Sequence, residues 1–137
     1  MKTLILAVLA TSLFFSANSQ AEWTSLIVDE ERNTETYVDA DRIRVSEGLV
    51  YYWSLTNHTE PRSDTIRSVK AYRKANCETY QKMLLSVTQY TGTMGEGSTV
   101  RGHYTPPPEW TSAMPNSKGE FLTLVVCMTV NDNPDDF

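Results

Sequence analysis

Apolar and polar residues alternate along much of the chain with the period of two that is typical of half-buried strands. Residues 49–57 show the clearest example, because Leu49, Tyr51, Trp53 and Leu55 fall on one face and the intervening residues on the other. This run is also rich in aromatic side chains, which favour strands. Shorter or less regular runs predict further strands at residues 23–28, 34–39, 65–72, 80–90 and 99–104.

A helical period replaces this alternation at residues 117–130. Ser117 and Glu120 have the spacing of a capping box, in which the Ser hydroxyl accepts from the Glu N–H and the Glu carboxylate accepts from the Ser N–H. An apolar stripe with i, i+3, i+4, i+7 spacing follows, and we expect this stripe to lie on the sheet. The stripe consists of Phe121, Leu124, Val125 and Met128, with Cys127 at its edge.

The strands come first and one helix comes last, so the predicted fold class is α+β. We expect an antiparallel sheet of about five or six strands with one C-terminal helix packed on it. The predicted segments are a signal peptide at residues 1–21, one domain at residues 22–130 and an acidic disordered tail at residues 131–137. Because one helix covers only part of one sheet face, we expect some sheet surface to stay exposed, with Tyr52 or Tyr90 in it, as a dimer interface or a ligand face.

The beginning of the chain has the three parts of a secretory signal. Lys2 supplies a positive charge, residues 4–15 form an apolar run, and Ser19, Gln20 and Ala21 give a small-x-small cleavage pattern. The apolar run is about a dozen residues long, whereas a membrane-spanning helix needs about 20. We therefore expect export through the Sec pathway to the periplasm, the cell surface or the extracellular medium, with no membrane span; a retained anchor is the alternative.

Cys77 and Cys127 are the two cysteines of the chain. In an oxidising compartment we expect them to form one disulfide. That bond closes a loop of about 50 residues and stabilises the fold by about 4 kcal/mol in the chain-entropy model. A metal site built on the cysteines would need further ligands, and neither His58 nor His103 lies at a short ligand spacing from them. The sequence therefore predicts a disulfide and no metal or cofactor.

Two groups of charged residues have both a structural and a functional interpretation. Asp39 and Asp41 flank a predicted turn, where their carboxylates can accept local backbone N–H groups, and a paired-carboxylate metal or acid/base site is the alternative. Basic residues gather in and just after the strand predicted at residues 65–72. They are typical of an edge or solvent face, and a patch for an acidic partner is the alternative. The basic residues are Arg67, Lys70, Arg73 and Lys74.

Glycine is frequent in residues 91–102, at Gly92, Gly95, Gly97 and Gly102. The order G-x-G-x-x-G is absent and no helix follows, which argues against a phosphate-binding loop. We expect a mobile hairpin loop with positive φ angles.

No residue pattern in the chain predicts catalysis. The order G-x-S-x-G is absent, and His58 and His103 lie in predicted loops without a patterned neighbour. A cysteine nucleophile would have to stay reduced in an exported protein that offers it a ready partner. The tryptophans and tyrosines could form an aromatic ligand surface, but we expect most of the tryptophans in the core. The tryptophans are Trp23, Trp53 and Trp110.

The charge balance narrows the class of partner. The chain has 12 Lys+Arg and 17 Asp+Glu, a formal net charge of −5, and loss of Lys2 with the leader makes it more negative. Such an acidic domain is a poor candidate for binding the phosphate backbone of nucleic acids. It is also a poor candidate for adhering to anionic lipid. We therefore expect a protein partner.

An ordered set of residues across nearly the whole mature chain resembles the surface-adhesin protein E family of Gram-negative bacteria. The set is Trp23, Tyr37, Val38, Asp39, Ile43, Arg44, Gly48, Val50, Trp53, Leu55, Ser68, Lys70, Cys77, Gly92, Met94, Gly95, Gly97, Trp110, Pro115, Ser117, Val126 and Cys127. The resemblance implies an antiparallel sheet with a C-terminal helix joined to it by the cysteine pair. It also implies a homodimer and, for the member that named the family, adhesion to host matrix proteins.

Three hypotheses for function follow. The first is an exported, non-enzymatic, adhesin-like binding protein that uses an exposed sheet face or loop to recognise a host matrix protein. The second is a periplasmic structural or inhibitor module that binds one bacterial protein partner. A small hydrolase is the third, and it requires His58 or His103 to lie in a deep cleft beside a carboxylate.

Overall fold

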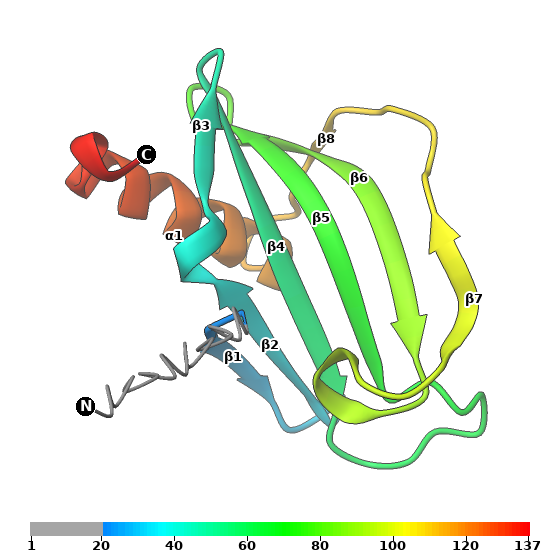
Figure 1. Ribbon diagram of the computed structural model, residues 1–137. Helices are drawn as coiled ribbons and strands as arrows, with labels where there is room; N and C mark the ends of the chain where they lie inside the picture. The colour runs from blue at the N-terminus through cyan, green and yellow to red at the C-terminus, as the bar shows by residue number, and fades with distance from the viewer. Residues whose placement is uncertain (1–20) are drawn as a thin grey trace, which may run out of the picture.

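The computed structural model describes residues 21–137, so the predicted signal peptide lies outside the described residues except for Ala21. Six strands form a continuous antiparallel sheet in the order β1-β2-β4-β5-β6-β7, and two short strands pair beside it (Figure 1). Their bounds are β1 Trp23–Asp29, β2 Thr34–Asp39, β4 Leu49–His58, β5 Ser68–Asn76, β6 Gln81–Tyr90 and β7 Thr99–Tyr104. The short strands are β3 Arg44–Ser46, which pairs with β4, and β8 Thr111–Ser112, which pairs with β6.

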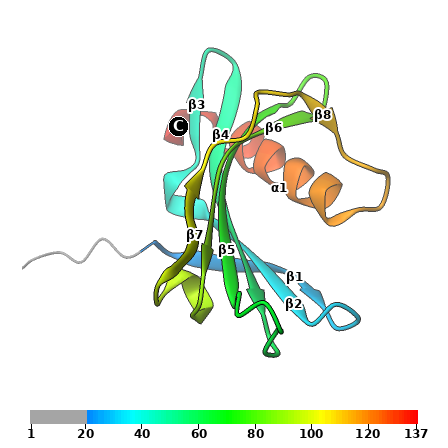
Figure 2. The same ribbon diagram turned by 90° about the vertical axis from the view of Figure 1, so that its right-hand side faces the viewer.

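The helix α1, Lys118–Asp132, lies across one face of this sheet (Figure 2). Its N-cap is Ser117, whose Oγ accepts from the Glu120 N–H at 3.2 Å, as predicted. The second half of the predicted capping box is displaced by one residue, because Glu120 Oε2 accepts from the N–H of Asn116 at 2.6 Å. The fold class is therefore the predicted one: an antiparallel sheet with a single C-terminal α-helix packed on it. Within residues 21–137, no helix is long and apolar enough to cross a membrane.

Strand β5 begins three residues later than predicted and continues further. Thr65 has a positive φ of 63°, and the Ile66 N–H donates to the side chain of Asp64 at 3.3 Å, so these residues belong to the preceding loop. As a consequence Arg73 and Lys74 lie inside the strand rather than after it. The sequence also missed β3, which is only three residues long and has no buried residue. Glu47 and Gly48, both with positive φ, connect it to β4 as a two-residue hairpin turn of type I′.

The C-terminal segment is helical in part. Helix α1 runs to Asp132, and a 3-10 turn, η3 Pro134–Asp136, follows it. All residues from 131 to 137 are exposed. The structure thus gives helical conformation to residues for which the sequence led us to expect disorder.

The core lies between α1 and the strands beneath it. It consists of Val38, Ile43, Val50, Tyr52, Ala75, Leu122, Val126 and Cys127. The helix therefore packs through the face that contains Leu122 and Val126, with Thr123 also buried. The prediction that the stripe beginning at Phe121 faces the sheet is wrong, because Phe121, Leu124 and Met128 are 47%, 38% and 60% exposed. Both stripes of this helix are apolar, so periodicity could not choose between them.

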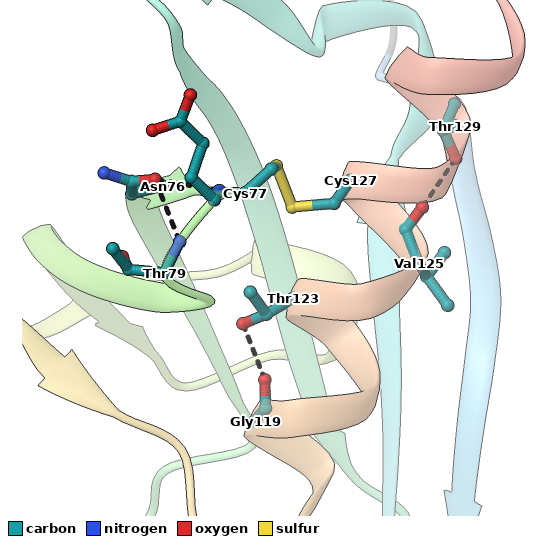
Figure 3. The surroundings of a disulfide bond; sticks show 9 residues. Asn76, Cys77, Thr79, Gly119, Thr123, Val125, Cys127 and Thr129 are labelled. Carbon is teal, nitrogen blue, oxygen red and sulfur yellow. Dashed lines mark hydrogen bonds between the residues drawn. A yellow bond between two sulfur atoms is a disulfide. The ribbon is translucent and has the colours of Figure 1, made fainter.

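A disulfide fastens the helix to the sheet. Cys77, in the turn between β5 and β6, bonds to Cys127 in α1, with a Cα–Cα distance of 5.6 Å (Figure 3). The predicted pairing is confirmed. Asn76 Oδ1 supports the turn by accepting from the N–H groups of Glu78 (2.9 Å) and Thr79 (3.2 Å).

Candidate functional site

The sheet face that α1 leaves uncovered carries a row of aromatic side chains. Alternation along β4 places Tyr51 and Trp53 on this face, whereas Tyr52 lies under the helix. Trp53 pairs with Tyr72 of β5, and their rings stack with centroids 4.7 Å apart and an interplanar angle of 24°. The Tyr51 ring lies 6.2 Å from the Tyr72 ring. We define the open face as five half-buried residues: Tyr51, Trp53, Lys70, Tyr72 and Lys74.

Cations lie close to the aromatic rings on and around the open face. Strand β5 supplies two of them, because Lys70 and Lys74 alternate with Arg73 and so share the face of Tyr72. A cation within about 6 Å of a ring centroid is attracted by the negative face of the π-system. The pairs are Arg42 with Trp53 (6.0 Å), Lys70 with Trp23 (5.8 Å) and Tyr90 (5.3 Å), and Lys74 with Trp110 (5.4 Å).

A buried carboxylate positions Arg42 over this face. Asp39, the last residue of β2, is fully buried, and its Oδ2 accepts from Arg42 Nε in an ion pair. The contact spans three residues because η1, a 3-10 helix of one turn at Ala40–Arg42, brings Arg42 back toward Asp39. The prediction that Asp39 caps backbone N–H groups is wrong, since no side-chain cap forms at this turn. Asp41 is exposed whereas Asp39 is buried, and no contact joins the two carboxylates into a paired site within residues 21–137.

The loop at residues 91–98 closes one end of the open face. The N–H of Met94 donates to Asn57 Oδ1 at 2.8 Å, and the N–H of Gly95 donates to Ser68 Oγ at 2.9 Å. Gly95 has a φ of +72°, a backbone conformation that favours glycine, and a Cβ there would also displace the end of the Lys70 side chain. A cavity of about 680 Å³ lies beside the loop. Its lining includes Trp23, Arg42, Lys70, Met94 and Glu96.

The glycine-rich segment has the positive φ angles that its composition predicts. They occur at Gly95, Gly97 and Gly102, whereas Gly92 has a φ of −104°. The mobility expected of this loop stays a prediction. Its hydrogen bonds to β4 and β5 show how it is held against the sheet.

The charges on the open face are only partly compensated by the protein. Burial lowers the pKa of Lys70, and the nearby charge of Arg42 lowers it further, while Asp39 and Glu96 act in the opposite direction. Burial also raises the pKa of Tyr72, which stays a neutral phenol. A partner that brings carboxylates to this face would therefore stabilise the charged form of Lys70.

The tryptophans lie on and around this face rather than in the core. Trp23 and Trp53 are half-buried, and Trp110 is 37% exposed. The expectation that most of them pack in the core is wrong. Tyr52 and Tyr90, named as candidates for exposed sheet surface, also differ: Tyr52 is fully buried under α1, while Tyr90 is half-buried beside Lys70.

The basic stretch does not lie on an edge strand, because β5 pairs with β4 on one side and β6 on the other. Its members also separate in space. Lys70 and Lys74 belong to the open face, Arg73 points under the helix, and Arg67 lies in the loop before the strand. Only Lys70 and Lys74 can contribute to a patch for an acidic partner on the open face.

The two histidines lie on different strands. His58 ends β4 and is half-buried, and burial lowers the pKa of His58, with Arg62 as the next cause. His103 is exposed on β7, with Nδ1 3.4 Å from Thr88 Oγ1. The structure does not bring them together. Within residues 21–137, no group of three or more His, Cys, Asp or Glu side chains could hold a metal ion.

Comparison with known proteins identifies the family. The sequence profile of the surface-adhesin protein E family matches residues 23–128. The chain belongs to this family. A search of curated proteins found no match. Membership in a surface-adhesin family supports an adhesin-like role for the chain and implies that it is exported.

Solved structures of protein E from Haemophilus influenzae have the same fold. One is 18% identical to the chain, with a TM-score of 0.61, and the match covers 82% of this chain and 89% of that one. A crystal structure from a non-typeable strain is 17% identical, with a TM-score of 0.58, and the match covers 80% and 78%. These likenesses support the architecture.

Proposed function

We propose that the chain is an exported, non-enzymatic, adhesin-like protein whose open face binds a host matrix protein. Family membership supports the adhesin-like role, and the row of stacked aromatic rings flanked by cations supports the choice of surface. Aromatic and arginine side chains dominate the energetics of protein–protein interfaces. The open face is the single observation on which the choice of surface depends.

The geometry of the open face favours a partner segment that is both acidic and apolar. Trp53 and Tyr72 are already stacked, so little side-chain entropy is lost when a partner covers them. Lys70 and Lys74 flank Tyr72 on the same strand, where they can meet carboxylates. The attraction is local, since the chain as a whole carries a net charge of −5.

A binding assay with matched variants tests this surface. The mature protein is passed over purified host matrix proteins that are immobilised separately, and Trp53→Ala and Tyr72→Ala are compared with Tyr80→Ala. Tyr80 is 50% exposed in the β5–β6 turn, away from the open face, so it controls for loss of an aromatic surface residue. We expect each open-face variant to weaken binding by about tenfold or more and the control to leave it unchanged.

Two results would contradict parts of the proposal. Binding that survives both open-face variants would place the matrix-binding surface elsewhere. Strictly periplasmic residence, combined with cross-linking to a single envelope protein, would replace matrix adhesion with the periplasmic module hypothesis. Cell fractionation followed by cross-linking in cells makes that distinction.

We also propose that the chain forms a homodimer through the outer stripe of α1, which we define as Phe121, Leu124 and Met128. These side chains lie at i, i+3 and i+7, so they form one continuous apolar strip on the exposed side of the helix. Burial of the same patch on two copies gives a two-fold symmetric contact. The family resemblance, which implies a homodimer, supports a second copy of the chain as the partner of this stripe.

Sedimentation velocity tests the dimer. Leu124→Glu places a charge in the centre of the strip and should shift the protein to monomer. Met114→Glu is the matched control, because Met114 is 77% exposed and lies outside the helix. A wild-type monomer at high micromolar concentration, or a dimer that Leu124→Glu leaves intact, would contradict the assignment.

A further inference from the structure

Three basic side chains and the beginning of α1 surround a small cavity on the helix-covered side of the sheet. The cavity has a volume of about 190 Å³, several times the roughly 30 Å³ that one water occupies in the liquid. Its lining consists of Thr34, Thr36, Ser54, Thr56, Arg73, Lys82, Lys118, Gly119 and Leu122. The lining thus combines cations with hydroxyl groups, and Leu122 is its single apolar side chain.

Arg73 enters this cavity from the middle of the sheet. The residue is half-buried and belongs to the lining of the cavity. Its Nη1 donates to Ser54 Oγ. Burial lowers the pKa of Arg73, and the one neighbour that acts in the opposite direction is the phenol of Tyr52. Within residues 21–137, no carboxylate forms an ion pair with this guanidinium.

Lys82 faces the same cavity from β6 and is also without a carboxylate partner in the described part of the chain. Its Nζ lies so close to Gly119 that a Cβ added there would run into it. The ammonium group therefore sits beside the first turn of α1, where the helix dipole is positive. Burial lowers the pKa of Lys82, and the charge of Arg73 lowers it further.

Lys118 completes the group from the first residue of the helix. Its Nζ donates to Thr34 Oγ1 at 2.8 Å and forms an ion pair with Asp29 at 2.8 Å. Asp29 is shared with Arg32 at 3.0 Å and lies outside the lining of the cavity, which contains no carboxylate. The cavity therefore holds more positive than negative charge, and the hydroxyls around it can donate to an anion but cannot neutralise a cation.

We propose that this cavity is a binding site for a small oxyanion of the sulfate or phosphate class, free or as a monoester. Such an anion would accept from Arg73, Lys82 and the threonine hydroxyls, and it would meet the positive end of α1. It would also relieve the repulsion between two cations that the protein itself leaves uncompensated. The site is separate from the proposed binding role of the open face, because it lies on the opposite side of the sheet.

Titration followed by amide NMR tests the site. Sodium sulfate is added to the ¹⁵N-labelled mature protein, and sodium chloride at equal ionic strength is added to a parallel sample. We expect saturable shifts for sulfate alone, largest at the amides of Gly119 and Glu120. The titration is then repeated with phosphate and with methyl phosphate. If methyl phosphate binds as tightly as phosphate, the cavity accepts a monoester; if only phosphate binds, the cavity accepts the free ion alone.

Three variants separate this site from general charge effects. Lys82→Gln removes one cation and should weaken sulfate binding by about tenfold or more, which is the effect of losing one charge-assisted hydrogen bond. Gly119→Ala keeps every charge and only requires the flexible end of Lys82 to shift away from the added methyl group, so it should weaken binding less than Lys82→Gln does. Lys74→Gln is the matched control on the opposite face, and it should change affinity by less than about twofold.

Defined outcomes overturn the proposal. One is a folded wild-type protein that shows no saturable shift at the start of α1, which would mean that the cavity holds only water. Another is a Lys74→Gln variant that loses as much affinity as Lys82→Gln.

Discussion

The two faces of the central strands have opposite environments although the same strands build both. On the covered side, α1 buries Tyr52 and Val50 completely or nearly so, and the disulfide holds the helix there. On the other side, Trp53 and Tyr72 stack on each other and stay half-buried. Burial under a helix contributes to stability, whereas partly exposed aromatic rings remain available to a partner. The covered side should thus contribute most of the stability, and the open side is where we propose that a host matrix protein binds.

Removal of the disulfide, which holds the helix on the covered side, is expected to have the largest effect on the free energy of unfolding. The double variant Cys77→Ala/Cys127→Ala loses a crosslink between residues 50 apart in sequence. We expect the free energy of unfolding to fall by about 4 kcal/mol, as measured by urea denaturation. The wild-type protein treated with a reducing agent is the control and should show a similar loss. A reduced protein as stable as the oxidised one would mean that packing alone holds the helix.

Two leucines of α1 allow the contribution of a buried side chain to be compared with that of an exposed one. Leu122 is 6% exposed and Leu124 is 38% exposed, so Leu→Ala at each position removes the same atoms from different environments. We expect Leu122→Ala to cost about 3 kcal/mol. Leu124→Ala should cost about 0.5 kcal/mol in the monomer. Thermal or urea unfolding at low protein concentration measures both. Equal costs would contradict the assignment of the helix face.

Removal of the Tyr52 hydroxyl should have a smaller effect on the free energy of unfolding, and it should stabilise the protein rather than destabilise it. The hydroxyl is buried and makes no hydrogen bond within residues 21–137. Tyr52→Phe should therefore raise the free energy of unfolding by about 1 kcal/mol, because a buried unsatisfied polar group is removed. Tyr51→Phe on the open face is the matched control and should leave stability unchanged. A destabilised Tyr52→Phe variant would show that this hydroxyl is hydrogen-bonded in the folded protein.

The smallest effect concerns pH and the contact between β1 and α1. Hydrogen bonds from Lys118 and then Arg32 hold the pKa of Asp29 well below its usual range. A carboxyl whose pKa is lower in the folded state stabilises the fold above its unfolded pKa, near about 4, and this contribution is lost as pH falls through the folded pKa. The difference in stability between wild type and Asp29→Asn should therefore be full at neutral pH and shrink in strong acid. Unfolding curves that stay parallel across this range would exclude the linkage.

Sequence alone predicted the parts of the fold that depend on local pattern. Residues 34–39 and 99–104 form the strands that their alternation indicated, and Ser117 caps the helix as expected. Strand β5 was misplaced because the positive φ of Thr65 has no signature in a threonine. The wrong helix face has a different cause: both stripes are apolar, and Cys127 was the one residue that could have decided between them, since its bond to Cys77 requires its side of the helix to face the sheet.

The candidate surfaces were harder to predict because they depend on which side of the sheet the helix occupies. Alternation in β4 separated Trp53 from Tyr52 correctly, but it did not say which of the two would be covered. The cavity at the start of α1 joins Arg73 and Lys82 to Gly119, residues far apart in sequence. A basic residue in a central strand could have indicated this cavity, because side chains at such positions are usually buried and a buried charge needs a partner.

The position of the crosslink also bears on how the polypeptide matures. Two cysteines allow one disulfide pairing within a chain, whereas four allow three. No rearrangement of wrongly paired disulfides is therefore needed after oxidation. The strands are joined in sequential order along most of the sheet, and they can assemble from neighbouring segments before the distant helix docks. Maturation should accordingly require a thiol oxidase but no disulfide isomerase, and the sheet can act as the template on which the last covalent bond is made.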